Sequence, residues 1–198
     1  MARDTSDHTP IGSIGDLFDH LAKGCKPETD FRLGTEHEKF AFFGGSHAPV
    51  PYFGDASISA LLKGMQASQG WDPIMDGENI IGLAEPHGMG AISIEPGGQF
   101  ELSGAPLENL HQTHAEAAEH LDILKTIADP LDIGFLGLGG SPKWSFDETP
   151  RMPKSRYQIM TRYMPKVGRH GLDMMYRTST IQVNLDFSSE ADMRRKMQ

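Results

Sequence analysis

Strict alternation of apolar and polar residues near the end of the sequence most restricts how this chain can fold. In the segment Arg177 to Phe187, every second residue from Ile181 onward is apolar, and the residues between them are polar. The apolar set is Ile181, Val183, Leu185 and Phe187, and the polar set is Thr178, Thr180, Gln182, Asn184 and Asp186. Successive side chains of a strand point to opposite faces, so the segment predicts a strand with one apolar and one polar face.

A second alternating segment contains the turn "SIEPGGQFELSG", Ser93 to Gly104. We expect one strand from Ala91 to Leu102, folded on itself at Pro96, Gly97 and Gly98 into a hairpin. Its apolar set is Ile92, Ile94, Phe100 and Leu102, and its polar set is Ser93, Glu95, Gln99 and Glu101. The turn leaves open a register shift of one residue. In "GTEHEKF", Glu36 and Glu38 lie two apart and therefore share one strand surface.

These polar faces allow two interpretations. Each could simply meet water, as in a half-exposed antiparallel sheet. However, they offer Glu, Asp, Gln and Asn with almost no Lys or Arg among them, and grouped carboxylates repel unless a cation lies between them. Oxygen ligands at strand spacing suit Mg²⁺, which commonly binds through a few carboxylates and substrate phosphates. The pattern therefore favours a divalent metal that carries a nucleotide phosphate.

Positive charge is concentrated in one loop-rich stretch. It contains Arg151, Lys154, Arg156, Arg162, Lys166 and Arg169. A solvated basic surface and a cover that binds phosphate or a substrate carboxylate explain the stretch about equally well. An acidic metal site with a basic cover is the arrangement that phosphoryl transfer requires.

The order of the remaining elements predicts an α+β fold with a mainly antiparallel sheet. We expect helices over residues 14–21, 58–65, 107–128 and 157–163, and strands over 31–43, 79–83 and 133–140. Ser189 and Asp192 have capping-box spacing, so a further helix should begin there, and the sequence stops inside it at Gln198. Residues 1–13 are expected to be a flexible leader. The 198 residues suffice for one domain, or for part of a larger one.

Composition and motifs exclude several classes of function. The formal net charge of -9 argues against a nucleic-acid binder, and the single cysteine, Cys25, excludes an internal disulfide. No apolar run is long enough to cross a membrane, and the start lacks the apolar core of a signal peptide, so we expect a cytoplasmic protein. The phosphate-binding loop of many nucleotide-binding proteins is absent. His114 lies on the apolar seam of its predicted helix, which favours a core histidine over a zinc ligand.

Several long motifs, in order, resemble glutamate-cysteine ligases of the plant and proteobacterial type. They are "GTEHEKF", "SIEPGGQFELSGAPLENLHQT", "MPKSRYQIMTRYMPKVG" and "GLDMM" followed by "QVNLDFSSEADM". The resemblance implies a glutamine-synthetase-like fold, in which a curved antiparallel sheet with helices on its outer face forms a funnel that holds Mg²⁺ and ATP. It also implies the first step of glutathione synthesis: ATP phosphorylates the γ-carboxylate of glutamate, and the amino group of cysteine attacks the γ-glutamyl phosphate.

By the same resemblance, Glu36, Glu38 and Glu101 are expected to be catalytic residues and metal ligands. Six residues are expected to contact substrate or nucleotide: Gln99, Lys154, Arg156, Arg162, Gln182 and Asn184. Family members are longer than this chain, so the resemblance implies the N-terminal part of one catalytic domain, an incomplete funnel, and a missing C-terminal half or self-association as partner. Alternatives are a non-catalytic remnant, one piece of a split enzyme, or a γ-glutamyl ligase that uses another amine or supplies ergothioneine synthesis. Whether this chain is active alone stays open.

Overall fold

The computed structural model describes residues 8–198. The strands are β1 (Leu33–Phe43), β2 (Asp72–Asp76), β3 (Asn79–Ala84), β4 (Ala91–Ile94), β5 (Phe100–Ser103), β6 (Ile133–Leu136) and β7 (Ile181–Leu185). The helices are α1 (Ile14–Ala22), α2 (Ile58–Gln69), α3 (Leu110–Ala128), α4 (Ser155–Val167), α5 (Gly171–Arg177) and α6 (Glu190–Lys196), with short 3-10 turns at Glu28–Asp30 and Asp129–Leu131. Part of the predicted leader, residues 1–7, lies outside the described residues, and residues 8–12 have no regular secondary structure.

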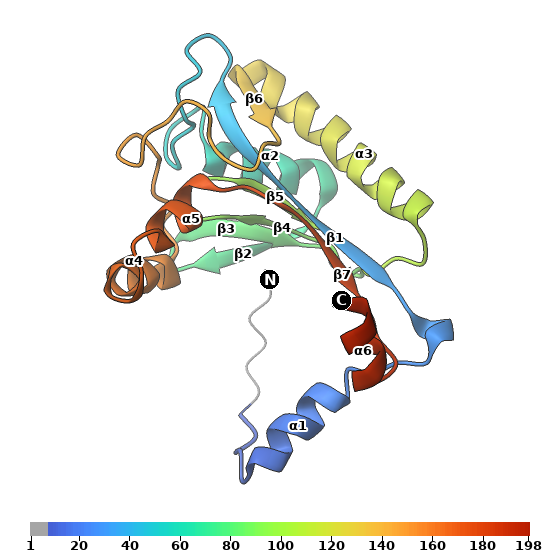
Figure 1. Cartoon of the computed structure of the whole chain (residues 1–198). Helices are drawn as coiled ribbons and strands as arrows, with labels where there is room; N and C mark the ends of the chain where they lie inside the picture. The colour runs from blue at the N-terminus through green and yellow to red at the C-terminus, as the bar shows by residue number, and fades with distance from the viewer. Residues whose placement is uncertain (1–7) are drawn as a thin grey trace.

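One antiparallel sheet organises the chain (Figure 1). Its strand order is β2-β3-β4-β5-β1-β6, and β7 also pairs with β1. The long strand β1 lies between β5 on one edge and both β6 and β7 on the other, and all of these pairings are antiparallel. The predicted α+β class and antiparallel sheet are therefore confirmed.

The core lies on one side of this sheet, which we call the helix face because α2 and α3 pack against it (Figure 1). The apolar hairpin residues Ile92, Ile94 and Phe100 are completely buried there, as the alternation predicts. They belong to the same core cluster as a row from α2 whose i, i+3, i+4, i+7 spacing makes one apolar helix stripe: Ile58, Leu61, Leu62 and Met65.

The sequence pattern misses two elements, β2 and α5. β2 reads "DPIMD", and a proline with two aspartates is a poor strand signal except at the edge of a sheet, where β2 lies. α5 ends at Arg177, where the final strand was expected to begin, so the strand starts four residues later at Ile181. Asp186, expected on the polar face of that strand, lies beyond its end and binds Lys26 Nζ at 2.8 Å.

α3 presents a different face to the sheet from the one expected. His114 is exposed, so its prediction as a core histidine is wrong, and the buried residues are Thr113, His120, Leu124 and Ala128. The helix begins at Leu110, because the Asn109 side chain accepts hydrogen bonds from the amides of His111 and Gln112.

No helix among residues 8–198 combines the length and apolarity that crossing a membrane requires.

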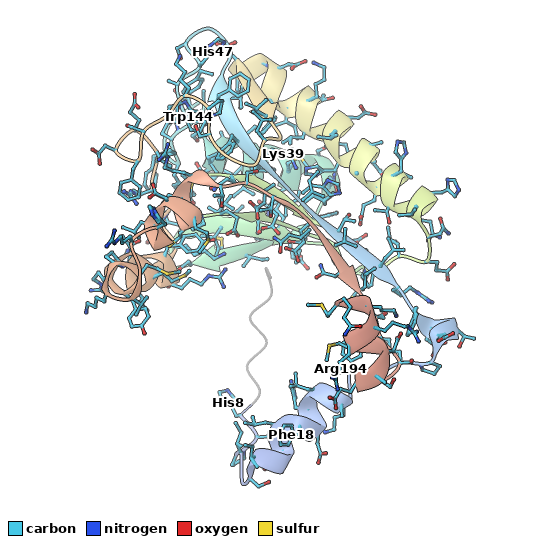
Figure 2. The ribbon with its side chains drawn as sticks, viewed as in Figure 1. His8, Phe18, Lys39, His47, Trp144 and Arg194 are labelled. Carbon is cyan, nitrogen blue, oxygen red and sulfur yellow. The ribbon has the colours of Figure 1, made fainter. Side chains whose placement is uncertain are left out.

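Two amphipathic elements leave apolar side chains exposed. In β7 the predicted alternation is confirmed, yet Ile181, Val183 and Leu185 are 70%, 58% and 59% exposed, since α2 and α3 cover other strands. α1 extends away from the sheet, and none of its residues is buried (Figure 1). Its apolar stripe includes Phe18, labelled in Figure 2.

Replacing Phe100 should show that the hairpin is anchored in the core. Phe100→Ala removes a side chain with no exposed surface, and we expect the free energy of unfolding to fall by about 3–5 kcal/mol. Phe18→Ala is the matched control, because Phe18 is 64% exposed and its loss should change stability by less than about 0.5 kcal/mol. Urea unfolding followed by circular dichroism measures both, and equal effects would contradict this description of the core.

Burial of His120 should make the fold sensitive to acid. Burial, together with Lys39 and His37, lowers the pKa of His120 to about 3, so the unfolded chain binds a proton that the folded chain excludes. The free energy of unfolding should therefore fall as the pH drops from 6.5 towards 3, by up to about 1.4 kcal/mol per pH unit from this group. His120→Phe should flatten that slope relative to wild type, and the same change at exposed His114 should not.

Candidate active site

The predicted polar residues of four strands do share one side of the sheet, opposite the helix face. We call this side, which carries Glu36, Glu38, Ser93, Glu101, Gln182 and Asn184, the carboxylate face. In the pairing register Glu38 lies opposite Glu101, and Ser93 also lies opposite Glu101. The polar residues of β4 and β5 therefore lie on the same face, without the one-residue register shift that the sequence left open. Figure 2 shows side-chain oxygens gathered beneath the strands.

The turn between β4 and β5 depends on its two glycines. Gly98 has a φ of 83°, a left-handed conformation that favours glycine. At Gly97 a Cβ atom would lie 2.2 Å from the carbonyl oxygen of Tyr176, so no other residue fits without moving that backbone. The sequence "EPGGQ" thus brings the hairpin against the end of α5 and fixes the positions of Glu95 and Gln99.

Glu101 is buried in the centre of the carboxylate face. It is 2% exposed, its Oε2 accepts a hydrogen bond from the Ser93 hydroxyl, and its Oε1 accepts one from the Ser103 hydroxyl at 2.9 Å. Both hydroxyl groups come from strand residues on the same face. These contacts hold the carboxylate in a defined position beside Glu38.

Glu38 and Glu36 accept hydrogen bonds from β7 and the residue before it. Glu38 Oε2 accepts from the Thr180 amide at 3.0 Å, and its Oε1 accepts from the Thr180 hydroxyl at 3.1 Å and from Gln182 Nε2 at 3.4 Å. Glu36 Oε1 accepts from Asn184 Nδ2 at 3.1 Å. Burial raises the pKa of Glu38 despite the Thr180 hydrogen bonds, and the charges of Glu101 and Glu36 raise it further.

Glu95 joins this cluster, although no site role was assigned to it from the sequence. Burial raises its pKa to about 7, and the carboxylates of Glu101 and Glu38 add to that shift while Lys154 opposes it. The Tyr157 hydroxyl donates to the Ile94 carbonyl at 2.8 Å and lies 3.3 Å from Glu95 Oε1. The alternation along the hairpin already places Glu95 on the same strand face as Ser93 and Glu101. The sequence therefore contained a signal that Glu95 belongs to the site.

The predicted basic residues, one just before α4 and two on it, divide between two places. Lys154 is buried near Tyr157, with 3.4 Å between Nζ and the hydroxyl, and Arg156 lies above the Tyr157 ring, on the side of the carboxylate cluster. Arg162 instead lines a separate cavity of about 460 Å³ with Arg151. The helix is fixed to the edge of the sheet by Asp76 of β2, whose carboxylate accepts from the Ser155 amide at 2.6 Å.

Gln99 connects two parts of the chain rather than projecting freely. Its side-chain oxygen accepts from the Gly97 amide at 2.9 Å, and its Nε2 donates to the carbonyl oxygens of Tyr176 and Thr178. The side chain is 1% exposed. Gln99 therefore fastens the hairpin turn to the connection between α5 and β7.

A cavity of about 640 Å³ opens between the carboxylate face, α4 and α5. Among the predicted site residues it is lined by Glu38, Gln99, Arg156 and Gln182. Its other polar lining residues are Glu95, Tyr157, Thr178 and Thr180. Glu36, Glu101, Lys154, Arg162 and Asn184 are not part of its lining. The cavity thus has carboxylates on its strand wall and a guanidinium on its helix wall.

Within residues 8–198, no three His, Cys, Asp or Glu side chains are placed as a ready metal site. The carboxylate oxygens instead contact hydroxyl and amide donors, as described above. The donor set still fits Mg²⁺, because this ion is commonly held by one or two carboxylates together with substrate phosphates.

Comparison with known sequences decides the family. The sequence model of glutamate-cysteine ligase family 2 matches residues 32–198. The chain belongs to this family. It is 59% identical to the chloroplastic glutamate-cysteine ligase of Medicago truncatula, 57% to that of Nicotiana tabacum and 56% to that of Arabidopsis thaliana, each over 181 residues. These alignments cover 91% of this chain.

The same alignments cover 34% to 35% of the relatives, so this member of glutamate-cysteine ligase family 2 spans about a third of their length. They also correct the expected location. The relatives are named chloroplastic, so the expectation of a cytoplasmic protein is wrong. That expectation rested on the missing signal-peptide core, and plastid transit peptides have no such core either.

Replacing Gln99 should separate support of the fold from ligand contact. Gln99→Ala leaves the Gly97 amide and two carbonyl oxygens without their partner, so we expect the free energy of unfolding to fall by about 1–3 kcal/mol. Gln158→Ala, an exposed change on α4, should have little effect. Chemical unfolding compares the two variants, and an unchanged stability of Gln99→Ala would show that the contacts are not structural.

Proposed function

We propose that this chain provides the metal and nucleotide surface of an ATP-dependent ligase that joins the γ-carboxylate of glutamate to the amino group of cysteine, the first step of glutathione synthesis. One observation carries the proposal: Glu38, Glu95 and Glu101 converge beside a 640 Å³ cavity, in a chain of glutamate-cysteine ligase family 2. The names of the relatives support the choice of glutamate and cysteine.

The charges of the site explain why such a surface suits this reaction. A nucleotide γ-phosphate and a glutamate carboxylate are both anions, so they approach each other only where positive charge offsets their repulsion. The carboxylate cluster itself has too little positive charge around it to stabilise its ionised form. The raised pKa values of Glu95 and Glu38 indicate this. A cation bound here would stabilise the ionised carboxylates and attract phosphate.

Glu36, Glu38 and Glu101 are the proposed ligands of Mg²⁺, and Glu95 adds a fourth carboxylate within the same cluster. When bound, the ion would neutralise the phosphate oxygens of ATP and polarise its γ-phosphate. Glu101 would supply a preformed oxygen position, because Ser93 and Ser103 already fix its orientation. Glu38 and Glu36 would exchange contacts with Thr180, Gln182 and Asn184 for the cation.

The helix wall of the cavity would bind the anionic parts of the substrates. Arg156 lines the cavity directly, and the ammonium of buried Lys154, beside Tyr157, acts on Glu95 through its charge. Arg162 would contribute only through the adjoining cavity. Gln182 and Asn184 would orient ligands from β7, and Gln99 would act mainly by fixing the turn. The curved sheet supports a glutamine-synthetase-like funnel as the finer description of this fold (Figure 1).

A second candidate is a non-catalytic piece that needs another chain segment for turnover. The exposed apolar row Ile181, Val183 and Leu185 and the coverage of a third of the relatives favour it. In this alternative the row is covered by further chain of the longer relatives or by a second copy. Binding of Mg·ATP without cysteine-dependent release of ADP would identify this case.

Calorimetric titration of the 198-residue chain with Mg·ATP tests the shared part of both candidates. We expect saturable binding, and Glu38→Gln should weaken it at least tenfold because it removes a charge from the carboxylate face. Glu119→Gln, an exposed change on α3, is the matched control and should bind as wild type does. Equal binding by all three proteins would exclude the carboxylate face as the nucleotide site. ADP release that requires both glutamate and cysteine would then establish ligation.

A further inference from the structure

A second cavity, of about 260 Å³, lies on the helix face, between the strands and α3. Apolar side chains from α3 and the strands make most of its wall: Leu102, Ala117, Leu121, Phe135 and Ile181. Its nitrogen-bearing side chains are His37, Lys39 and His120. Figure 2 labels Lys39 between the sheet and α3, away from the carboxylate face. Glu38 and Gly137 complete the lining, so one ammonium, two imidazole rings and one glutamate lie beside an otherwise apolar wall.

Lys39 supplies positive charge to this cavity. Its side chain is 7% exposed, its Nζ donates to the His37 carbonyl at 2.8 Å, and no carboxylate of residues 8–198 is recorded within ion-pair distance of it. A buried ammonium with no carboxylate within ion-pair distance is costly.

His120 supplies a buried ring nitrogen that has no hydrogen-bond partner. The residue is 5% exposed, and its Nε2 has no hydrogen-bond partner among the residues that the structure describes. The ring stacks beside Phe100, with 6.4 Å between centroids and 22° between planes, which fixes its orientation in the wall. His37 is already occupied, because its Nε2 lies 3.0 Å from the Thr35 hydroxyl. A buried polar nitrogen left unpaired costs about 1–3 kcal/mol, and such groups usually have a partner.

We propose that this cavity binds a small aliphatic monocarboxylate, with its carboxylate between Lys39 Nζ and His120 Nε2 and its hydrocarbon chain against Leu102, Leu121 and Phe135. A monoanion matches the single ammonium, and two carboxylate oxygens match two separate nitrogen donors. The apolar wall disfavours phosphate, because its remaining oxygens would find no donors there. The two nitrogens proposed to bind the carboxylate, Lys39 Nζ and His120 Nε2, belong to no proposed metal ligand, and Glu38 lines both cavities.

Titration of the 198-residue chain with sodium butyrate, followed by the carbon-bound proton signals of the histidine rings, tests the site. We expect the His120 and His37 signals to shift saturably with a millimolar dissociation constant, and the signal of exposed His114 to stay constant. Two further probes separate the contributions of charge and chain. Butylammonium, which has the same chain and the opposite charge, and inorganic phosphate, which has no chain, should each bind at least tenfold more weakly.

Two matched variants complete the experiment. Lys39→Met keeps an unbranched side chain and should weaken butyrate binding at least tenfold, whereas Lys125→Met, at an exposed position of α3, should leave it unchanged. Absence of a saturable shift in the wild-type chain would overturn the proposal even if Lys39→Met fails to fold. Phosphate binding as tight as butyrate binding, or equal butyrate binding by Lys39→Met and wild type, would also overturn it.

Discussion

Antiparallel pairing of β1 with both β5 and β7 is the constraint on which the rest of this structure depends. The register sets Glu38 opposite Glu101, and it brings Gln182 beside Glu36 from the other edge of β1. The three strands come from distant parts of the sequence, so only their pairing gathers these side chains. A shift of one residue in either pairing would turn the carboxylates towards the apolar core.

The same alternation that builds the carboxylate face also builds the core. Ile92, Ile94 and Phe100 are buried under α2 and α3 because they alternate with Ser93 and Glu101. Burial then sets the charges on both sides: it raises the pKa of Glu95 to about 7 and lowers that of Lys39 to about 8. A bound cation would therefore stabilise the carboxylate face. A bound anion would stabilise the cavity beside Lys39.

Most of the fold follows from alternation and helix periodicity, and the failures have local causes. Which residues of β7 and of the hairpin share a face was predictable from their alternation, although only the hairpin has a buried apolar face. The buried face of α3 was not, because Thr113 and His120 pack on the sheet where apolar Leu110 and Leu121 were expected. The positions of individual side chains were less predictable from the sequence than the helices and strands that carry them. Nothing in the spacing of Gln99 indicated that its amide would bind Thr178, and Arg162 faces a different cavity from Arg156.

The central claim is that the carboxylates paired across β1 and β5 hold a metal ion that carries a nucleotide. Paramagnetic broadening by Mn²⁺ with ATP, read from the backbone amide signals of the 198-residue chain, tests it most directly. The account predicts that broadening begins at the amides around Glu38, Glu95, Glu101 and Gln182, while those of α1 and α3 stay sharp. Broadening centred elsewhere, or spread evenly over the exposed acidic residues, would contradict it.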